Sequence, residues 1–198
     1  MYHHLQGRLV EKTPTYAVID CGGVGYQVNI SLHTFAKLGS NEQCKLLVHL
    51  SVKEDSLSLF GFADEDERRL FRQLISVSGI GENTARMMLS SLSPAEIQQA
   101  ILSSNIPVLQ SIKGIGNKTA QRLVLDLKDK ISKSDSIITP MLDGFTMVDH
   151  QLKDQAMAAL LTLGFGKPAV EKVLNSILRA SKEMPTLEVL IKMALNQL

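Results

Sequence analysis

The chain has 198 residues, of which 44% are hydrophobic, a content typical of globular proteins rather than disordered ones. Its formal net charge of +1 excludes a uniformly basic protein that coats nucleic acid, so any such contact must come from local patches. No run approaches the roughly 20 apolar residues that span a bilayer, and no apolar segment follows a basic start. We therefore expect a cytoplasmic protein without membrane segments.

Cysteine and histidine residues give no sign of a disulfide framework or a metal site. Only two cysteines occur, Cys21 and Cys44, and both lie in or beside strand-like runs, which favours buried reduced thiols. The five histidines are scattered, without cysteine or carboxylate partners at metal-ligand spacing. We therefore predict neither a metal nor another cofactor.

Residues 1–63 are predicted to form a small β-barrel. Apolar residues alternate or cluster between turn signals in five short runs, 7–10, 16–19, 26–30, 45–50 and 56–60. A helical patch at 31–38, between the third and fourth runs, is compatible with an OB-fold. Gly22-Gly23-Val24-Gly25 stands between two runs and opens no helix, so it predicts a hairpin turn and not a dinucleotide-binding loop.

The last two runs are joined by Lys53-Glu54-Asp55, which places two adjacent acids at the tip of a hairpin. A solvated turn would explain these residues, because aspartate favours turns. In a DNA-binding protein of balanced charge, the same acidic tip could instead repel phosphates. The hairpin alone leaves both interpretations open.

Residues 64–131 are predicted to be helical. Asp64 is a candidate N-cap for the first helix, and Ser93-Pro94-Ala95-Glu96 has the pattern of a capping box. The first helix also carries three arginines that we expect on a solvated face, Arg68, Arg69 and Arg72.

A short pattern occurs twice within this helical segment. Gly79-Ile80-Gly81 and Gly114-Ile115-Gly116 each stand at the start of a helix, 35 positions apart, and each is followed by Thr-Ala at the same spacing. Glycine adopts positive φ at low cost and lets a ligand approach the main chain, so the amides of such a turn can converge on an anion. A single copy would fit an ordinary loop, but the duplication favours a tandem helix-hairpin-helix pair that grips two phosphates of a nucleic-acid backbone.

The second copy is followed by Asn117, Lys118, Thr119 and Arg122, which are candidate DNA contacts together with the turn. Four-residue spacing places Lys118 and Arg122 on one helix face, where a phosphate would be neutralised. The segment is not a nucleotide-binding P-loop, because Asn117 separates Gly116 from Lys118.

The first copy has Glu82 and Asn83 at the places of Asn117 and Lys118. Arg86 is its only nearby cation in the sequence, and an acid stands where a phosphate should approach. We therefore expect the first turn, with Arg86, to contact DNA more weakly than the second.

Periodicity fails over residues 132–148, where serines, Pro140 and Gly144 predict a flexible connection. Residues 149–198 are predicted to form three short helices that begin at Asp149, near Pro168 and at Thr186. About 50 residues make a minimal core, so some apolar side chains should stay exposed and offer a patch to a protein partner. Candidate anchors, each also explained by core packing, are Leu160, Leu163, Phe165 and Leu187.

This order of barrel with acidic hairpin, tandem Gly-Ile-Gly turns, connection and three-helix tail resembles the RuvA family, whose members recognise four-way (Holliday) DNA junctions in bacteria. The resemblance covers the whole chain. It rests on Gly7-Arg8-Leu9, Gly22 with Val24-Gly25-Tyr26, Glu54-Asp55 with Leu59-Phe60-Gly61-Phe62, both Gly-Ile-Gly turns, and Leu163-Gly164-Phe165.

The resemblance implies an α+β, multi-domain, non-enzymatic homotetramer that acts in recombination, DNA repair and the SOS response to DNA damage. Its turns would grip DNA backbones, and Glu54 and Asp55 would lie near the crossover of an open junction. The tail would engage the ATP-driven motor RuvB, and the resolvase RuvC would share the junction, enclosed by one or two tetramers. Glu82 and Asn83 depart from related chains, which usually carry a basic residue nearby.

Two other classes of protein remain open. A helix-hairpin-helix DNA glycosylase or lyase would need a catalytic carboxylate beyond the second turn, often beside an iron–sulfur cluster or a lysine nucleophile. Here Asp126 lies inside a predicted helix, and the cysteines are too few for a cluster. A protein adaptor built on the barrel and the tail would leave the duplicated turns unexplained.

Overall fold

The computed structural model of the chain describes residues 2–39, 42–135, 147–180 and 185–198. The chain divides into two compact units, Met1–Ile138 and Thr139–Leu198. The first unit contains β1 (His4–Lys12), β2 (Tyr16–Cys21), β3 (Val24–Ile30), α1 (Leu32–Lys37), β4 (Gln43–Val52), β5 (Leu57–Phe62), α2 (Glu65–Ile75), α3 (Glu82–Ser91), α4 (Pro94–Leu102), α5 (Ile106–Gln110) and α6 (Asn117–Asp135). The second contains α7 (Met147–Thr162), α8 (Lys167–Ala180) and α9 (Leu187–Leu195).

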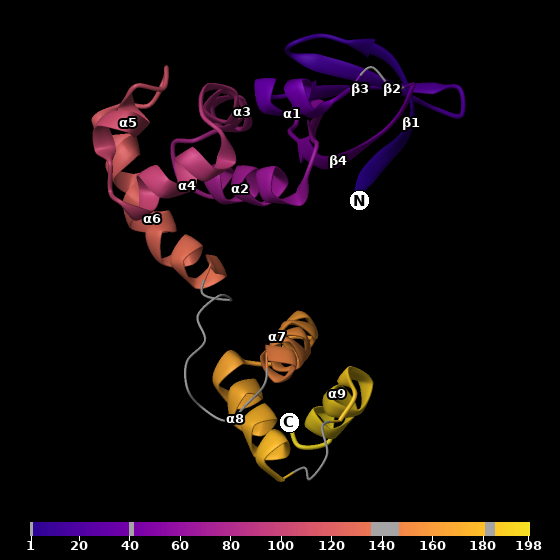
Figure 1. Ribbon diagram of the computed structural model, residues 1–198, viewed down its shortest axis with the longest axis vertical. Helices are drawn as coiled ribbons and strands as arrows, with labels where there is room; N and C mark the ends of the chain where they lie inside the picture. Colours follow the sequence, from indigo (N-terminus) through magenta and orange to yellow (C-terminus); the bar gives the residue numbers. More distant parts are fainter. Residues whose placement is uncertain (1, 40–41, 136–146, 181–184) are drawn as a thin grey trace. The chain divides into compact units, whose positions relative to one another are not determined.

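The five strands close into a barrel in the order β1-β2-β3-β5-β4, which confirms the predicted OB-like architecture (Figure 1). All neighbours are antiparallel except β3 and β5, which run parallel. The turn between β2 and β3 is made by Gly22 and Gly23 at φ values of +68° and +92°, as the glycine run predicted. The barrel encloses a core of Leu5, Ala17, Ile19, Val28, Ile30, Leu38, Leu46 and Val48.

The helices of the first unit pack directly against the end of the barrel. Phe60 and Phe62 of β5 contact Phe71 of α2, with ring centroids 5.3 and 4.9 Å apart, so strand and helix share one apolar core. Figure 1 places α1 beside α3, and the Leu32 N–H of α1 donates to the Ser90 hydroxyl of α3 at 3.1 Å. These contacts fix the helical region relative to the barrel.

Local capping signals in the helical region are confirmed. The Asp64 side chain accepts the Glu67 N–H at the start of α2, and Ser93 and Glu96 form a capping box at the start of α4. The expectation of a solvated arginine face was wrong for Arg68, which is 3% exposed. Its guanidinium donates to the His3 carbonyl at 2.9 Å and so ties α2 to the amino-terminal segment.

The second unit is a small bundle of α7, α8 and α9 around one apolar core. Its first helix begins at Met147 rather than at Asp149, and α6 continues through Asp135, past the expected helix end. The rest of the expected connection, 136–146, lies outside the described residues. Across the part of the chain that is described, we find no helix with the length and apolar character needed to cross a bilayer.

Candidate nucleic-acid interface

The two Gly-Ile-Gly turns have the same backbone geometry. The first glycine of each turn has a positive φ, +94° at Gly79 and +93° at Gly114. In both turns the isoleucine N–H, of Ile80 or Ile115, donates at 3.1 Å to the carbonyl three residues earlier. A side chain at either first glycine would strain this backbone, which explains why the pattern requires glycine there.

Each turn leads directly into the first turn of a helix. Gly81 is the N-cap of α3, and its carbonyl accepts the Ala85 N–H at 2.9 Å; Gly116 and Ala120 repeat this bond at 2.9 Å before α6. The amides at a helix start have no partners within the helix and carry the positive end of the helix dipole. Both turns therefore have the backbone of an anion-binding site.

The first turn lies against the helix that the second turn begins. A hollow with a volume of about 440 Å³ joins them, lined by Ser78, Gly79, Lys118, Thr119, Gln121, Arg122 and Leu125. Arg122 reaches across it, with its Nη1 3.4 Å from the Ser78 carbonyl oxygen. The cations of the second copy thus stand beside the backbone of the first, which a reading of each copy in isolation did not show.

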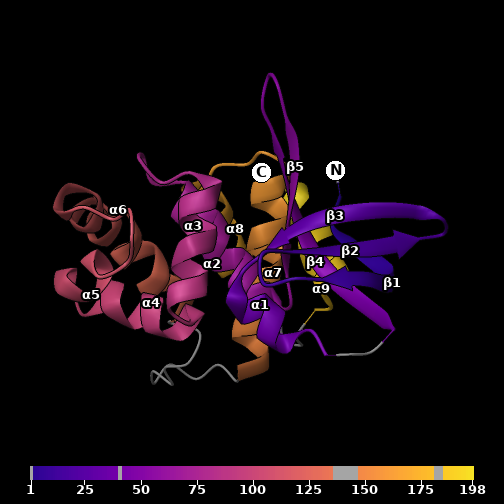
Figure 2. The ribbon, with the colours of Figure 1, turned by 90° about the horizontal axis from the view of Figure 1, so that it is seen from above.

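The hairpin of β4 and β5 extends beyond the rest of the barrel (Figure 2). Glu54 and Asp55 lie at its tip, between the two strands. The tip closes through a bond of 2.9 Å from the Lys53 N–H to the Ser56 carbonyl, and Glu54 and Asp55 between them are exposed. The stem is also exposed, since Val52 keeps 66% and Leu57 73% of its surface accessible. The hairpin therefore presents two carboxylates without an apolar contact that anchors its outer part.

Arg86 does not point its charge toward the first turn. Its Nη1 donates to the Thr15 carbonyl at 2.9 Å and lies 3.4 Å from the Asn29 Oδ1, both of the barrel. Burial lowers the pKa of this guanidinium. The position favours a role in holding α3 against the barrel, so the expected contact between Arg86 and DNA has no support in the geometry.

The comparisons with known proteins match all three parts of the chain. The family description "RuvA N terminal domain" matches residues 1–61, "SAM-like Helix-hairpin-helix tandem" matches 71–129, and "RuvA, C-terminal domain" matches 151–198. The chain is 50% identical over 201 residues to a protein of Christiangramia forsetii and 50% over 199 residues to one of Flavobacterium psychrophilum, covering 100% of both chains in each pair. A protein of Cytophaga hutchinsonii is 44% identical over 198 residues, 99% of each chain.

The chain belongs to the RuvA family. Each of these three relatives is named "Holliday junction branch migration complex subunit RuvA". The RuvA resemblance seen in the sequence is confirmed, and so are the barrel, the tandem helix-hairpin-helix region and the helical tail.

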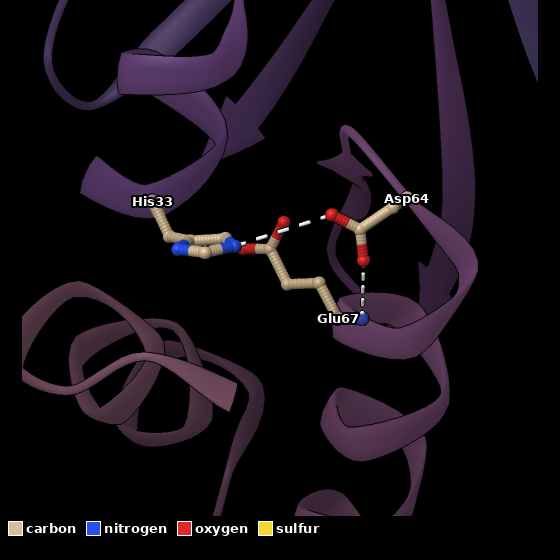
Figure 3. A group of neighbouring side chains, drawn as sticks. All are labelled: His33, Asp64 and Glu67. Atoms are coloured by element: carbon tan, nitrogen blue, oxygen red, sulfur yellow. Dashed lines mark hydrogen bonds and ion pairs between the residues drawn. The ribbon is translucent and has the colours of Figure 1, made fainter. Parts of the chain in front are cut away.

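One group of side chains in this RuvA-family chain has metal-ligand chemistry, although sequence spacing gave no sign of it (Figure 3). His33 of α1 lies beside Asp64 and Glu67 of the α2 start, with the candidate ligand atoms within 4.8 Å of one another. Each carboxylate oxygen already accepts a protein donor. Asp64 accepts from Lys37 and the Glu67 N–H, and Glu67 accepts from Thr34 and Ser31.

The pKa values of Glu67 and Asp64 are shifted by burial and by hydrogen bonds between α1 and α2. Burial is the largest influence on Glu67 and raises its pKa, despite the hydrogen bonds from Ser31 and Thr34. Burial also acts to raise the pKa of Asp64, but the hydrogen bonds from Lys37 and from the Glu67 N–H outweigh it and lower that pKa. The donors that fill these oxygens connect the barrel to the helical region.

The tail exposes only part of the apolar set proposed from the sequence. Leu160 is fully buried in the core that α7 shares with α8 and α9, so core packing, the alternative left open for it, explains this residue and it is not an exposed anchor. Phe165 and Leu187 are half-buried against the same core, whereas Leu163 is 61% exposed. Three further apolar side chains on α9, which no sequence pattern singled out, are also exposed: Val189, Met193 and Leu195.

Proposed function

We propose that this chain binds four-way DNA junctions without catalysing a reaction itself, in a cytoplasmic complex for branch migration in recombination and repair. The observation that carries the proposal is the hollow where the first turn meets Lys118 and Arg122, because it combines the anion-binding backbone of that turn with two cations of the helix that the second turn begins. The names of the relatives, which cover the full chain, point to the same substrate. DNA contacts are assigned to both turns, Asn117, Lys118, Thr119 and Arg122.

The deciding experiment compares binding to four-way, linear duplex and damaged duplex DNA of the same base composition. The proposal expects the tightest band shift with the four-way DNA and unchanged strands after incubation. A preference for damaged duplex with base release would favour the glycosylase alternative, and binding to none of the three would favour an adaptor.

We infer that the chain acts as a homotetramer. A four-way junction presents four equivalent arms, whereas one chain carries a single pair of turns and a single acidic hairpin. A tetramer with fourfold symmetry would therefore provide one pair of turns for each arm. Light scattering should give about four times the chain mass of 21.8 kDa. A monomer that persists at micromolar concentration would contradict this inference.

The acidic tip is assigned to the junction centre, where Glu54 and Asp55 would repel phosphates and penalise an intact duplex. Replacing both by Gln and Asn should retain or increase affinity for all DNA while lowering the preference for four-way over linear DNA. A general loss of DNA affinity would instead show that these carboxylates stabilise the fold.

The tail is assigned to the ATP-driven motor RuvB, and the resolvase RuvC is proposed to share the junction. Leu163, Val189 and Met193 are the anchors to test, because they are exposed apolar residues on a small bundle. Leu163→Ser should abolish stimulation of the motor while the tail stays folded by circular dichroism. Leu160→Ala, in the tail core, is the matched control that should lower the stability of the tail itself.

A further inference from the structure

Glu82 is not an unpaired acid beside the first turn. The Ser51 hydroxyl donates to its Oε1 at 2.7 Å, and the Lys53 ammonium donates to its Oε2 at 3.0 Å. Both donors come from the end of β4 and the base of the acidic hairpin, so one carboxylate of α3 is held by one edge of the barrel.

These contacts connect two parts of the proposed DNA surface. Glu82 directly follows Gly81 of the first turn, and Lys53 directly precedes Glu54 of the acidic tip. Ser51 is 7% exposed, so one end of the connection is fixed in the packed barrel. The hydrogen bonds therefore set the position of the acidic tip relative to the first phosphate-binding turn.

The outer hairpin has little else to fix its direction. Val52 and Leu57 form its stem and are mostly exposed, so apolar burial does not hold it. The stem residues pair with each other, and a bond of 2.9 Å from Lys53 to Ser56 closes the tip, but these bonds move with the hairpin. The side-chain contacts with Glu82 link this hairpin base to the helical region.

We propose that Ser51, Lys53 and Glu82 form a latch that holds the acidic hairpin at a fixed place beside the first Gly-Ile-Gly turn, which makes Lys53 and Glu82 positioning residues for four-way DNA. The latch rests on the proposed function, because its effect is to increase the preference for four-way over linear DNA. A fixed acidic tip meets phosphates on an intact duplex but not in an open crossover. A tip that can swing aside avoids that repulsion, which falls steeply with distance in salt.

The charge state of Glu82 supports this assignment. The Ser51 hydroxyl, the N–H of Glu82 itself and the Lys53 ammonium lower the pKa of Glu82 to about 2. The carboxylate is therefore ionised and engaged near neutral pH. An acid that repels phosphate would need to face the incoming DNA with its charge uncompensated, whereas this one is neutralised by Lys53.

The experiment uses the full chain with Glu82→Gln, Lys53→Met and both changes together. Removing the acid should by itself tighten binding to all DNA, and removing the cation should weaken it. If the latch exists, both variants nevertheless lose the same property: the ratio of four-way to linear affinity falls by about threefold in each, and the double variant falls no further. Band shifts at one fixed salt concentration measure these ratios.

Hydrogen exchange in the DNA-free protein gives an independent readout. Amides of residues 52–57 should exchange faster in Glu82→Gln and in Lys53→Met than in the unmodified chain. The matched control is Arg69→Met, which breaks an ion pair of 2.8 Å with Asp66 on the exposed face of α2 and should change neither readout.

Three results would overturn the latch: unchanged exchange over 52–57, affinity ratios that move in opposite directions, or ratio changes that add in the double variant. If the unmodified chain shows no preference for four-way DNA, the proposed function fails. The exchange measurement then still decides whether Glu82 restrains the hairpin.

Discussion

The two Gly-Ile-Gly turns share a backbone and differ in almost everything that surrounds it. Gly79 and Gly114 have φ values within one degree of each other, and the helices behind them begin with the same hydrogen bond. The second turn is followed by Asn117 and Lys118, whereas the first is followed by Glu82, which is bound to the barrel. The comparison shows that the glycine pattern specifies the anion-binding shape, while neighbouring elements decide the charge.

The difference also changes what the duplication means. If the two turns were independent phosphate-binding sites, each would need its own cation, and the first turn would bind phosphate more weakly. Instead Arg122 of α6 extends to Ser78, which places a cation of the second copy beside the first turn. The first copy is left free to hold the acidic hairpin through Glu82.

The largest effects are expected at the first glycines. Gly79→Ala and Gly114→Ala should each lower the free energy of unfolding by about 1 kcal/mol, because alanine is strained at positive φ although an added Cβ meets no atom within 4 Å. Junction affinity should fall at least about tenfold with either variant, which corresponds to about 1.4 kcal/mol of binding. Thermal unfolding and band shifts provide both measurements.

Gly81→Ala and Gly116→Ala are the matched controls, since neither glycine has a positive φ. They should leave unfolding unchanged and weaken DNA binding only, because the added methyl group stands where the phosphate approaches the main chain. Equal stability losses at all four glycines would mean that the positive φ of Gly79 and Gly114 is not the cause of the loss.

Arg122 should matter more than Lys118 if it serves both turns. Arg122→Ala is expected to weaken junction binding by about tenfold and Lys118→Ala by less, and the slope of log affinity against log salt should fall by about 1 per contact removed. The Arg122→Ala effect should shrink in a Gly81→Ala background if this side chain acts at the first turn. Lys172→Ala, an exposed lysine of α8, should leave affinity and slope unchanged.

Local patterns predicted the parts of this molecule that depend on local physics. The barrel, the Gly22-Gly23 turn, the capping box and the two turns follow from apolar spacing and glycine conformation, which adjacent residues determine. The same argument could not separate Leu160 from Leu163. Leu160 lies on α7 and is buried by the packing of α8 and α9, whereas Leu163 follows the end of that helix and stays exposed.

Contacts between distant segments were outside the reach of sequence patterns. Glu82 meets Ser51 and Lys53, about 30 positions earlier in the chain, and Arg86 reaches Thr15, 71 positions away. Charge alone predicted that Glu82 opposes phosphate and that Arg86 binds it. The structure instead directs both side chains to the barrel, and a pairing between a β-hairpin and a helix start has no signal in local spacing.

A smaller effect is expected on the pH dependence of stability, which should differ between Glu82 and its counterpart Asn117. The pKa of Glu82 is lowered to about 2 from 4.5, so its contribution to stability is fully present above about pH 4.5 and is lost as the pH falls through about 2. Lys53 is 58% exposed, and solvent screening reduces that contribution to about 1 kcal/mol. Glu82→Gln should therefore cost stability at pH 7 in urea unfolding, and the cost should vanish near pH 2.

Asn117→Asp provides the comparison at the second turn. A carboxylate there would interact favourably only with the positive end of the helix dipole, so the substitution should change the free energy of unfolding by less than about 0.5 kcal/mol. If Glu82→Gln costs nothing at pH 7, or costs the same at pH 2, the ion pair with Lys53 does not contribute to the fold.

The smallest effect is expected from giving the first turn the charge of the second. Asn83 is exposed and occupies the place of Lys118, so Asn83→Lys should add one phosphate contact. Junction affinity should rise by about threefold at low salt, and the salt slope should steepen by about 1. Asn83→Gln, which lengthens the side chain without charge, should change neither. Arg122 lies beside this turn, so the affinity gain from Asn83→Lys should be larger in an Arg122→Ala background than in the unmodified chain, by a factor of at most about two. If Asn83→Lys gives no gain in the Arg122→Ala background, the first turn holds no phosphate of its own.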